Sequence, residues 1–430
     1  MLSIFLALAA CDGDTPSTST STSTSTSTST DTEDATTDTE TTPAVSWHAD
    51  IQPLLRDNCL SCHADDGISF SLEDPAIAAA MGEVMVDAVA SGRMPPWPAQ
   101  EEGCQPLQGS RVLSASQLAL LEEWVALGAP EGRPEDAPVE LEEEERPFEA
   151  DISLMLSEPF TPALDREDDY RCFVLDPGVT DTEFVTGIEV TPGNRSIVHH
   201  VILYTDPSGT AAAALDAAEP GAGYSCFGGP GFNDTGVIGG WAPGQGTIWL
   251  PEGVGLRLAP ETPIVAQFHY HPVNDPGASD QTVIEIDTEP SVATEGYLLP
   301  LAHQGIAIPA GAAEHTETKT ITFNYGISGR LWGGTPHMHL LGSSIRVSIT
   351  PPDSTEETCL IDVPEWDFDY QNFYLFEEAF TVENGSSITL ECIYDNSTSN
   401  PNQPNDPPLD VGWGDGTADE MCLAFALISL

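Results

Sequence analysis

The chain has 430 residues, of which 40% are hydrophobic, and this length is enough for several domains with buried cores. Its 69 acidic and 12 basic residues give a formal net charge of −57 at pH 7. Such a surface repels nucleic acid and gains nothing from anionic lipid headgroups, so nucleic acid is excluded as a partner. The charge favours a role in solubility in salty surroundings, and a basic redox partner steered toward the protein is the alternative.

The N-terminus reads MLSIFLALAAC, a short apolar run that ends at Cys11. Residues 1–11 resemble a bacterial lipoprotein signal with its lipobox, and cleavage before Cys11 would leave a lipid-bearing cysteine at the new N-terminus. An ordinary signal peptide with an incidental cysteine is the alternative. The first interpretation predicts an exported bacterial lipoprotein, anchored to a membrane on the periplasmic or outer-surface face of the cell envelope.

Three segments of different composition follow the signal. Residues 12–45 are almost entirely Ser, Thr, Asp and Glu, a composition that predicts a disordered tether. Residues 46–133 contain SWHADIQPLLRDNC, DPAIAAAMGEVMVDAVASG and SASQLALLEEWVALG, where apolar residues recur every three or four positions. This spacing predicts a small all-α domain. An acidic, proline-bearing linker over 134–150 separates that domain from the rest.

From residue 151 onward the pattern changes to short alternating stretches separated by Gly, Pro and Asn. Examples are SIVHHVILYTD, PIVAQFHYHPV, SIRVSITPP and SSITLECIYDN. Alternation of this kind predicts all-β sandwiches, and roughly 280 residues suit two of them, over 151–295 and 296–430. The predicted fold class is therefore multidomain, with one small all-α domain followed by two all-β domains.

The α-helical segment contains CLSCH at residues 59–63, the C-x-x-C-H signature of covalent haem attachment. Cys59 and Cys62 would form thioethers with the haem, and His63 would coordinate its iron. Met94, in the proline-bound loop SGRMPPWP, is the predicted second axial ligand, with His48 as the competitor. A thioredoxin-like dithiol and a zinc half-site fit less well, since neither a βαβ pattern nor a second CxxC is present. The segment 46–133 resembles a single-haem cytochrome c domain.

Three histidine clusters occur in the predicted strands. They are His199 with His200, His269 with His271, and His337 with His339. His337 and His339 are two residues apart, so on a strand both imidazoles point to one face. Met421, in the apolar ending EMCLAFALISL, could face the same core. Two imidazoles and a soft thioether favour copper over zinc.

The ordered set of HH, HYHP, HMH and EMC resembles the copper type II, ascorbate-dependent monooxygenases, the group of dopamine β-hydroxylase and peptidylglycine α-hydroxylating monooxygenase. The resemblance covers residues 150–430 and implies two jelly-roll-like sandwiches with one copper each. It implies that His199, His200 and His269 hold an electron-storing copper. It implies that His337, His339 and Met421 hold the catalytic copper, where O₂ and substrate react. His271 is expected to lie just outside the ligand set.

Two positions depart from the peptide-amidating branch of this family. Where that branch has an arginine and a tyrosine for the substrate carboxylate, this chain has Thr335 and Phe425. A peptidylglycine substrate is therefore not expected. The resemblance also favours a disulfide between Cys392 and Cys422.

The remaining cysteines fit an exported, oxidised protein. After Cys11, Cys59 and Cys62 are assigned to lipid and haem, six of the nine cysteines remain for disulfides. After Cys392 with Cys422, the next disulfide expected is Cys172 with Cys226. The partners of Cys104 and Cys359 stay open.

The leading hypothesis is a copper monooxygenase that hydroxylates an activated C–H bond of a small organic substrate with O₂. Electrons would reach it through the fused haem from an external donor, either a redox protein or ascorbate. The alternative is a non-catalytic electron-transfer or copper-binding surface lipoprotein.

Overall fold

The computed structural model describes residues 44–65, 69–100, 102–138, 148–165, 168–233, 235–242, 245–368, 370–414 and 416–430. All of them belong to one compact unit, Pro43–Leu430. The predicted signal with Cys11, nearly all of the predicted tether and residues 139–147 of the predicted linker lie outside the described ranges. Among the described residues, no helix has the length and apolar character needed to cross a membrane.

The segment before residue 134 is helical, as its spacing predicts. Side chains that accept backbone N–H bonds begin several of its helices: Ser46 caps the first, Asp74 caps α3, and Ser114 with Gln117 forms a capping box on α4. The elements are η1 (Trp47–Ile51), α1 (Gln52–Asn58), α2 (Leu60–His63), α3 (Pro75–Ala90), α4 (Ala115–Ala126) and η2 (Pro134–Asp136).

Two tryptophans form the centre of the helical segment. Trp47 and Trp124 are 1% and 0% exposed, and their ring centroids lie 6.0 Å apart. Ile51, Leu55 and Leu121 complete this core. Burying each such side chain contributes roughly 1.5–3 kcal/mol. The all-α prediction is confirmed for this segment, and its identity as a cytochrome stays a prediction.

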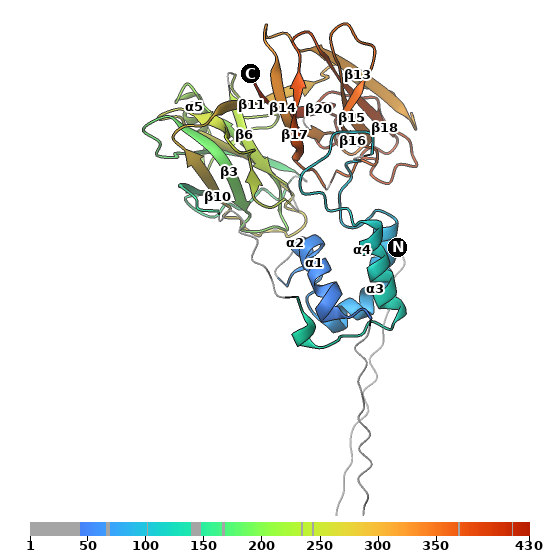
Figure 1. Cartoon of the computed structure of the whole chain (residues 1–430). Coiled ribbons are helices and arrows are strands. Elements are labelled where there is room, and N and C mark those ends of the chain that lie inside the picture. Colours follow the sequence, from blue (N-terminus) through green and yellow to red (C-terminus); the bar gives the residue numbers. More distant parts are fainter. Residues whose placement is uncertain are drawn as a thin grey trace, which may run out of the picture. The chain divides into compact units, whose positions relative to one another are not determined.

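The β region forms two sandwiches that share one long sheet (Figure 1). In this sheet β8 pairs with β11 in parallel, so the pairing joins the two halves of the chain. In sheet order the strands are β1 (Ile152–Met155), β10 (Val283–Glu289), β3 (Glu183–Thr191), β8 (Val254–Leu258), β11 (Thr294–Ala302), β20 (Leu423–Ser429), β14 (Gly329–His337) and β17 (Tyr374–Val382), with β7 (Ile248–Trp249) paired to β3.

A separate second sheet covers each half of the long sheet. The N-terminal sandwich adds β5 (Tyr224–Ser225), β2 (Asp169–Leu175), β9 (Ile264–Tyr270), β4 (Val198–Thr205) and β6 (Gly236–Trp241). The C-terminal sandwich adds β13 (His315–Thr322), β18 (Ser387–Tyr394), β15 (Gly342–Thr350) and β16 (Thr358–Val363). The remaining elements are α5 (Ala211–Asp216) and the pair β12 (Ala307–Ile308) with β19 (Val411–Gly412). The prediction of two all-β sandwiches is confirmed.

Residues 97–108, which the sequence places in the helical domain, pack instead on the C-terminal sandwich. Trp97 and Leu107 join its core, and the Trp97 ring meets the ring of Tyr374 edge-on at 5.4 Å. Gln108 donates its backbone N–H to the carbonyl of Leu375, and Leu107 forms a β-bridge with Phe376. We call residues 97–108 the strap.

Three disulfides join cysteines within the described residues. Cys172–Cys226 and Cys392–Cys422 are the two pairs expected from the sequence, and each lies within one sandwich. Cys104–Cys359 pairs the two cysteines whose partners were open, and it ties the strap to β16.

Candidate metal centres

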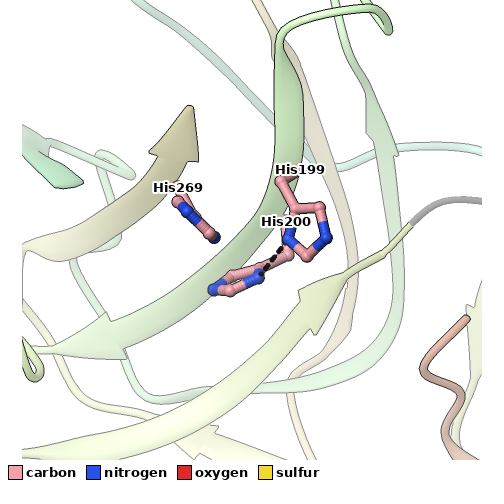
Figure 2. Close-up of side chains that lie close together, drawn as sticks. All are labelled: His199, His200 and His269. Carbon is pink, nitrogen blue, oxygen red and sulfur yellow. Dashed lines mark hydrogen bonds between the residues drawn. The ribbon is translucent and has the colours of Figure 1, made fainter. Parts of the chain in front are cut away.

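The N-terminal histidine cluster consists of His199 and His200 on β4 and His269 on the adjacent strand β9 (Figure 2). Successive residues on a strand normally point to opposite faces, so two neighbouring histidines need a special backbone to reach one site. The register between β4 and β9 shifts between Val198 and His200, which is the signature of a β-bulge. This bulge turns both imidazoles toward His269. One ligand atom from each of the three residues lies within 4.8 Å of the others.

A carboxylate orients His269. The His269 Nε2 atom lies 2.9 Å from Asp168 Oδ1, and His271 Nε2 lies 2.8 Å from the same oxygen. Because a carboxylate only accepts, His269 carries its proton on Nε2 and presents the lone pair of Nδ1. That Nδ1 atom is buried and has no hydrogen-bond partner. A buried, unpartnered imidazole lone pair beside two further imidazoles is a donor set that could hold a metal ion.

Burial keeps two imidazoles of this cluster neutral. It lowers the pKa of His269 to about 4 and, with repulsion from neighbouring imidazoles, lowers that of His200 well below its usual range. Burial acts to raise the pKa of Asp168, but hydrogen bonds from His269 and His271 outweigh it and hold that pKa well below its usual range. At neutral pH His200 and His269 are therefore neutral, and the carboxylate of Asp168 is ionised.

The C-terminal candidate set consists of the predicted ligands His337, His339 and Met421, which all line one cavity. His337 ends β14, and the ring centroids of His337 and His339 lie 5.1 Å apart. Met338 between them is 0% exposed in the core of the sandwich, which is the alternation predicted for HMH. Met421 precedes β20, next to the disulfide-bonded Cys422, and its backbone carbonyl accepts from the Tyr394 hydroxyl.

Neutral acceptors orient these two imidazoles. His337 Nδ1 lies 2.6 Å from Gln371 Oε1, and His339 Nδ1 lies 3.1 Å from the backbone carbonyl of Asp419. Both contacts place the proton on Nδ1 and leave the Nε2 lone pairs available. Burial lowers the pKa of His339 to about 3, so this imidazole is also neutral.

Glu420 fixes the backbone of the C-terminal set. Its side chain is 0% exposed and accepts from the N–H groups of His339, Leu341 and Met421 at 3.0, 2.6 and 3.1 Å. Burial raises the pKa of this carboxyl to about 8 even though these N–H bonds oppose the shift. One side chain thus joins the His-x-His segment to the methionine segment.

A cavity of about 330 Å³ connects the two sets. Its lining includes His200 from the N-terminal cluster and all three members of the C-terminal set. Phe368 touches both sets: its ring stacks on His199 at 5.0 Å and meets His339 at 6.0 Å. The carbonyl of Phe368 accepts from Gln371, the residue that orients His337. Residues of both sets therefore line the same cavity.

The CLSCH residues lie on the helical segment. Neither Cys59 nor Cys62 is in a disulfide. His63 Nδ1 lies 2.8 Å from the Phe70 carbonyl, so its proton is on Nδ1 and Nε2 is left for a ligand. Met94 is 42% exposed, and no described contact joins it to His63. His48 lies in η1, with Nε2 3.6 Å from Glu131.

Sequence reasoning missed four residues of the metal sites. These are Asp168, Phe368, Gln371 and Glu420. A signal existed for Glu420, because an acidic residue beside Met421 at the start of an apolar strand predicts a buried role. No local pattern marks the other three, since their partners lie far along the chain.

Comparison with known proteins agrees with this geometry. Residues 297–427, which span β11 to β20, match the family model described as copper type II ascorbate-dependent monooxygenase, C-terminal domain. The DBH-like monooxygenase protein 1 of Gallus gallus is 25% identical over 296 residues, which are 62% of this chain and 45% of that protein. These matches support the copper type II monooxygenase family.

The human protein of the same name is 25% identical over 262 residues, covering 55% of this chain and 40% of its own. The chain thus spans less than half the length of these relatives. Among solved structures, the major capsid protein P2 of bacteriophage PM2 aligns with a TM-score of 0.26 and 6% identity over 64% of this chain and 96% of that one. That score is too low to indicate a shared fold.

Proposed function

We propose that the protein is a copper-dependent monooxygenase that hydroxylates a small organic substrate. The balanced reaction is R–H + O₂ + 2 e⁻ + 2 H⁺ → R–OH + H₂O. The observation that carries the proposal is that one cavity is lined by residues of both histidine sets. Of the two sets, only the C-terminal set includes a thioether, that of Met421. The matches to copper type II monooxygenases support the same reaction class.

The donor sets fit copper. His337, His339 and Met421 combine two imidazoles with a soft thioether, which favours copper over zinc, magnesium or calcium. His199, His200 and His269 supply imidazoles alone and would hold the second, electron-storing copper. Bound copper supplies the redox chemistry that O₂ activation needs. The chain's own residues fix the tautomers through Asp168, Gln371 and the Asp419 carbonyl, and Phe368 fills space between the two sets.

The fused helical segment is proposed to carry one covalent haem. Two cysteines outside any disulfide and a histidine with its proton held on Nδ1 fit thioether attachment and iron ligation by His63. Several large apolar side chains of the segment are exposed, among them Phe70, Ile77, Val84 and Met94 at 42% to 53%. A bound haem would cover apolar side chains of this kind. Met94 is the proposed second axial ligand.

The haem would pass electrons to the copper sites one at a time, from an external donor such as a redox protein or ascorbate. The copper type II monooxygenase family implies ascorbate as a reductant. The lipoprotein signal at Cys11 supports a lipid anchor and an exported protein at the cell envelope. Three disulfides within the described residues fit an oxidising compartment.

The test is the metal and haem content of the purified protein, followed by O₂ consumption with candidate substrates. Two coppers and one haem per chain, with O₂ uptake matched by hydroxylated product, are the expected result. One haem without copper would contradict the proposal and leave a cytochrome carried on two structural sandwiches. Two coppers with no O₂ uptake coupled to product would favour the non-catalytic electron-transfer alternative.

A further inference from the structure

The wall of the cavity has a composition unlike the rest of the chain. The whole protein has 69 acidic and 12 basic residues, yet none of the described residues that line the cavity is Asp, Glu, Lys or Arg. Most lining residues are aliphatic, aromatic or glycine. They come from both sandwiches, with Ile238 and Trp241 on β6 and Leu423 and Phe425 on β20. In the copper-free protein, a charged group entering this space would meet no opposite charge among the described lining residues.

Four of the five amide side chains of the lining have hydrogen bonds within the protein. Gln267 donates to the Cys226 carbonyl at 2.6 Å, and Gln371 contacts both His337 and the Phe368 carbonyl. The oxygen of Gln245 accepts from the N–H of Ala242 at 3.1 Å, and the oxygen of Asn372 accepts from the N–H of Phe373 at 2.9 Å. A polar ligand would have to break these bonds to gain the bonded atoms. The fifth amide, Gln304, and the NH2 groups of Gln245 and Asn372 can still meet a ligand, and all of them are uncharged.

Thr335 and Phe425 both line this cavity. They occupy neighbouring strands, since the register pairs Thr335 on β14 with Phe425 on β20. A hydroxyl and a phenyl ring stand together at this point of the wall, and neither carries a charge. The described side chains of the wall nearest the C-terminal set are therefore as uncharged as the rest.

We propose that the substrate of this cavity is an uncharged, predominantly apolar small molecule, and neither an amine nor a carboxylic acid. The reaction assigned to that substrate rests on the proposed function, but its binding does not. Moving an unpaired ammonium or carboxylate from water into an apolar wall is strongly unfavourable, whereas burying a hydrocarbon group is favourable. A volume of about 330 Å³ is at the small end of ligand pockets, which span roughly 300–1,000 Å³.

The experiment compares three ligands of similar shape by isothermal titration calorimetry: n-propylbenzene, its cationic counterpart 2-phenylethylammonium, and phenylacetate. The full chain is used copper-free, because a bound copper ion would itself attract phenylacetate. Physiological ionic strength limits the attraction of the cation to the acidic surface. The neutral ligand is expected to bind at least tenfold more tightly than either ion. Equal or tighter binding of either ion, or no binding of n-propylbenzene, would overturn the proposal.

A change of charge at Thr335 gives a second test. Thr335→Arg places a cation in the cavity wall and is expected to raise the affinity for phenylacetate at least tenfold while lowering that for n-propylbenzene. Thr318→Arg adds the same charge on the exposed strand β13 and should change neither affinity. Circular dichroism checks that both variants are folded. Unchanged ligand preference in folded Thr335→Arg would contradict the proposal.

The outcomes separate this inference from the proposed function. A chain that binds n-propylbenzene but takes up no copper would keep an apolar binding site and lose the monooxygenase assignment. A chain that binds two coppers and consumes O₂ with an amine substrate would keep the function and lose the inference.

Discussion

The two metal centres use the same residue type in differently constructed surroundings. In the N-terminal cluster a shared, ionised carboxylate holds His269 and His271, and a β-bulge aligns two adjacent histidines. In the C-terminal set neutral acceptors hold His337 and His339, and the thioether of Met421, the third proposed ligand, lines the same cavity. An anionic partner makes an imidazole a stronger donor and favours the more oxidised metal, whereas a thioether favours Cu(I). The difference suits one centre to store charge and the other to meet O₂.

Removing the thioether of Met421 should cause the largest loss of activity, because it deletes the ligand type that distinguishes the C-terminal centre. Met421→Ile keeps an apolar side chain of similar size and deletes the soft ligand, so product formation is expected to fall at least about 100-fold. Copper at the N-terminal cluster and the haem spectrum should not change, and EPR with optical spectra measures both. Product formation within a factor of three of wild type would show that Met421 is not a ligand.

Replacing each orienting side chain separately tests whether the two centres bind copper independently. Asp168→Asn removes the carboxylate on His269 and should weaken copper at the N-terminal cluster roughly 10- to 100-fold, with little effect on the other centre. Gln371→Leu is the matched variant and should weaken only the C-terminal centre. Competition with a chelator, followed by EPR of each centre, measures the two affinities. Equal loss at both centres in either variant would refute separate control.

The structure shows which parts of these centres the sequence could predict. HMH followed directly from strand alternation, because His337 and His339 share a face while Met338 enters the core. The alternating stretches likewise predicted β4, β9, β15 and β18. The convergence of His199 and His200 could not be derived, because a bulge depends on the pairing strand. The strap was missed for a similar reason: SGRMPPWP has no periodicity, and the partner of Trp97 is Tyr374, far along the chain.

The buried imidazoles predict a loss of stability in acid for the copper-free protein. The pKa of His269 is about 4 in the fold and about 6.5 in the unfolded chain, so between these values the unfolded chain binds the extra proton. This contribution is fully present above pH 6.5 and is lost as pH falls toward 4. By pH 5 it amounts to about 2 kcal/mol.

The control for this effect is His269→Gln. Lowering the pH protonates carboxylates and reduces their mutual repulsion in both proteins, so the difference between the two isolates His269. Wild type is expected to lose about 2 kcal/mol more than the variant between pH 7 and pH 5 in urea unfolding. Parallel curves for the two proteins would mean that His269 is not buried in its neutral form.

The smallest effect concerns Phe368, the ring that touches both centres. Phe368→Leu removes the stacking on His199, worth about 0.5–1.5 kcal/mol, and should weaken copper at the N-terminal cluster roughly two- to tenfold. Phe323→Leu makes the same change in the core of the C-terminal sandwich and is the matched control. If both variants bind copper like wild type, Phe368 only fills space.

The strap gives the chain an unusual connectivity. Cys104 and Cys359 are 255 residues apart, and their bond encloses the acidic segment between the helices and the first sandwich. A protease that cuts within residues 134–150 would therefore release no fragment. The two pieces would migrate as one species on a non-reducing gel and separate only after reduction. The helical segment therefore stays covalently joined to the sandwiches even after the peptide chain between them has been cut.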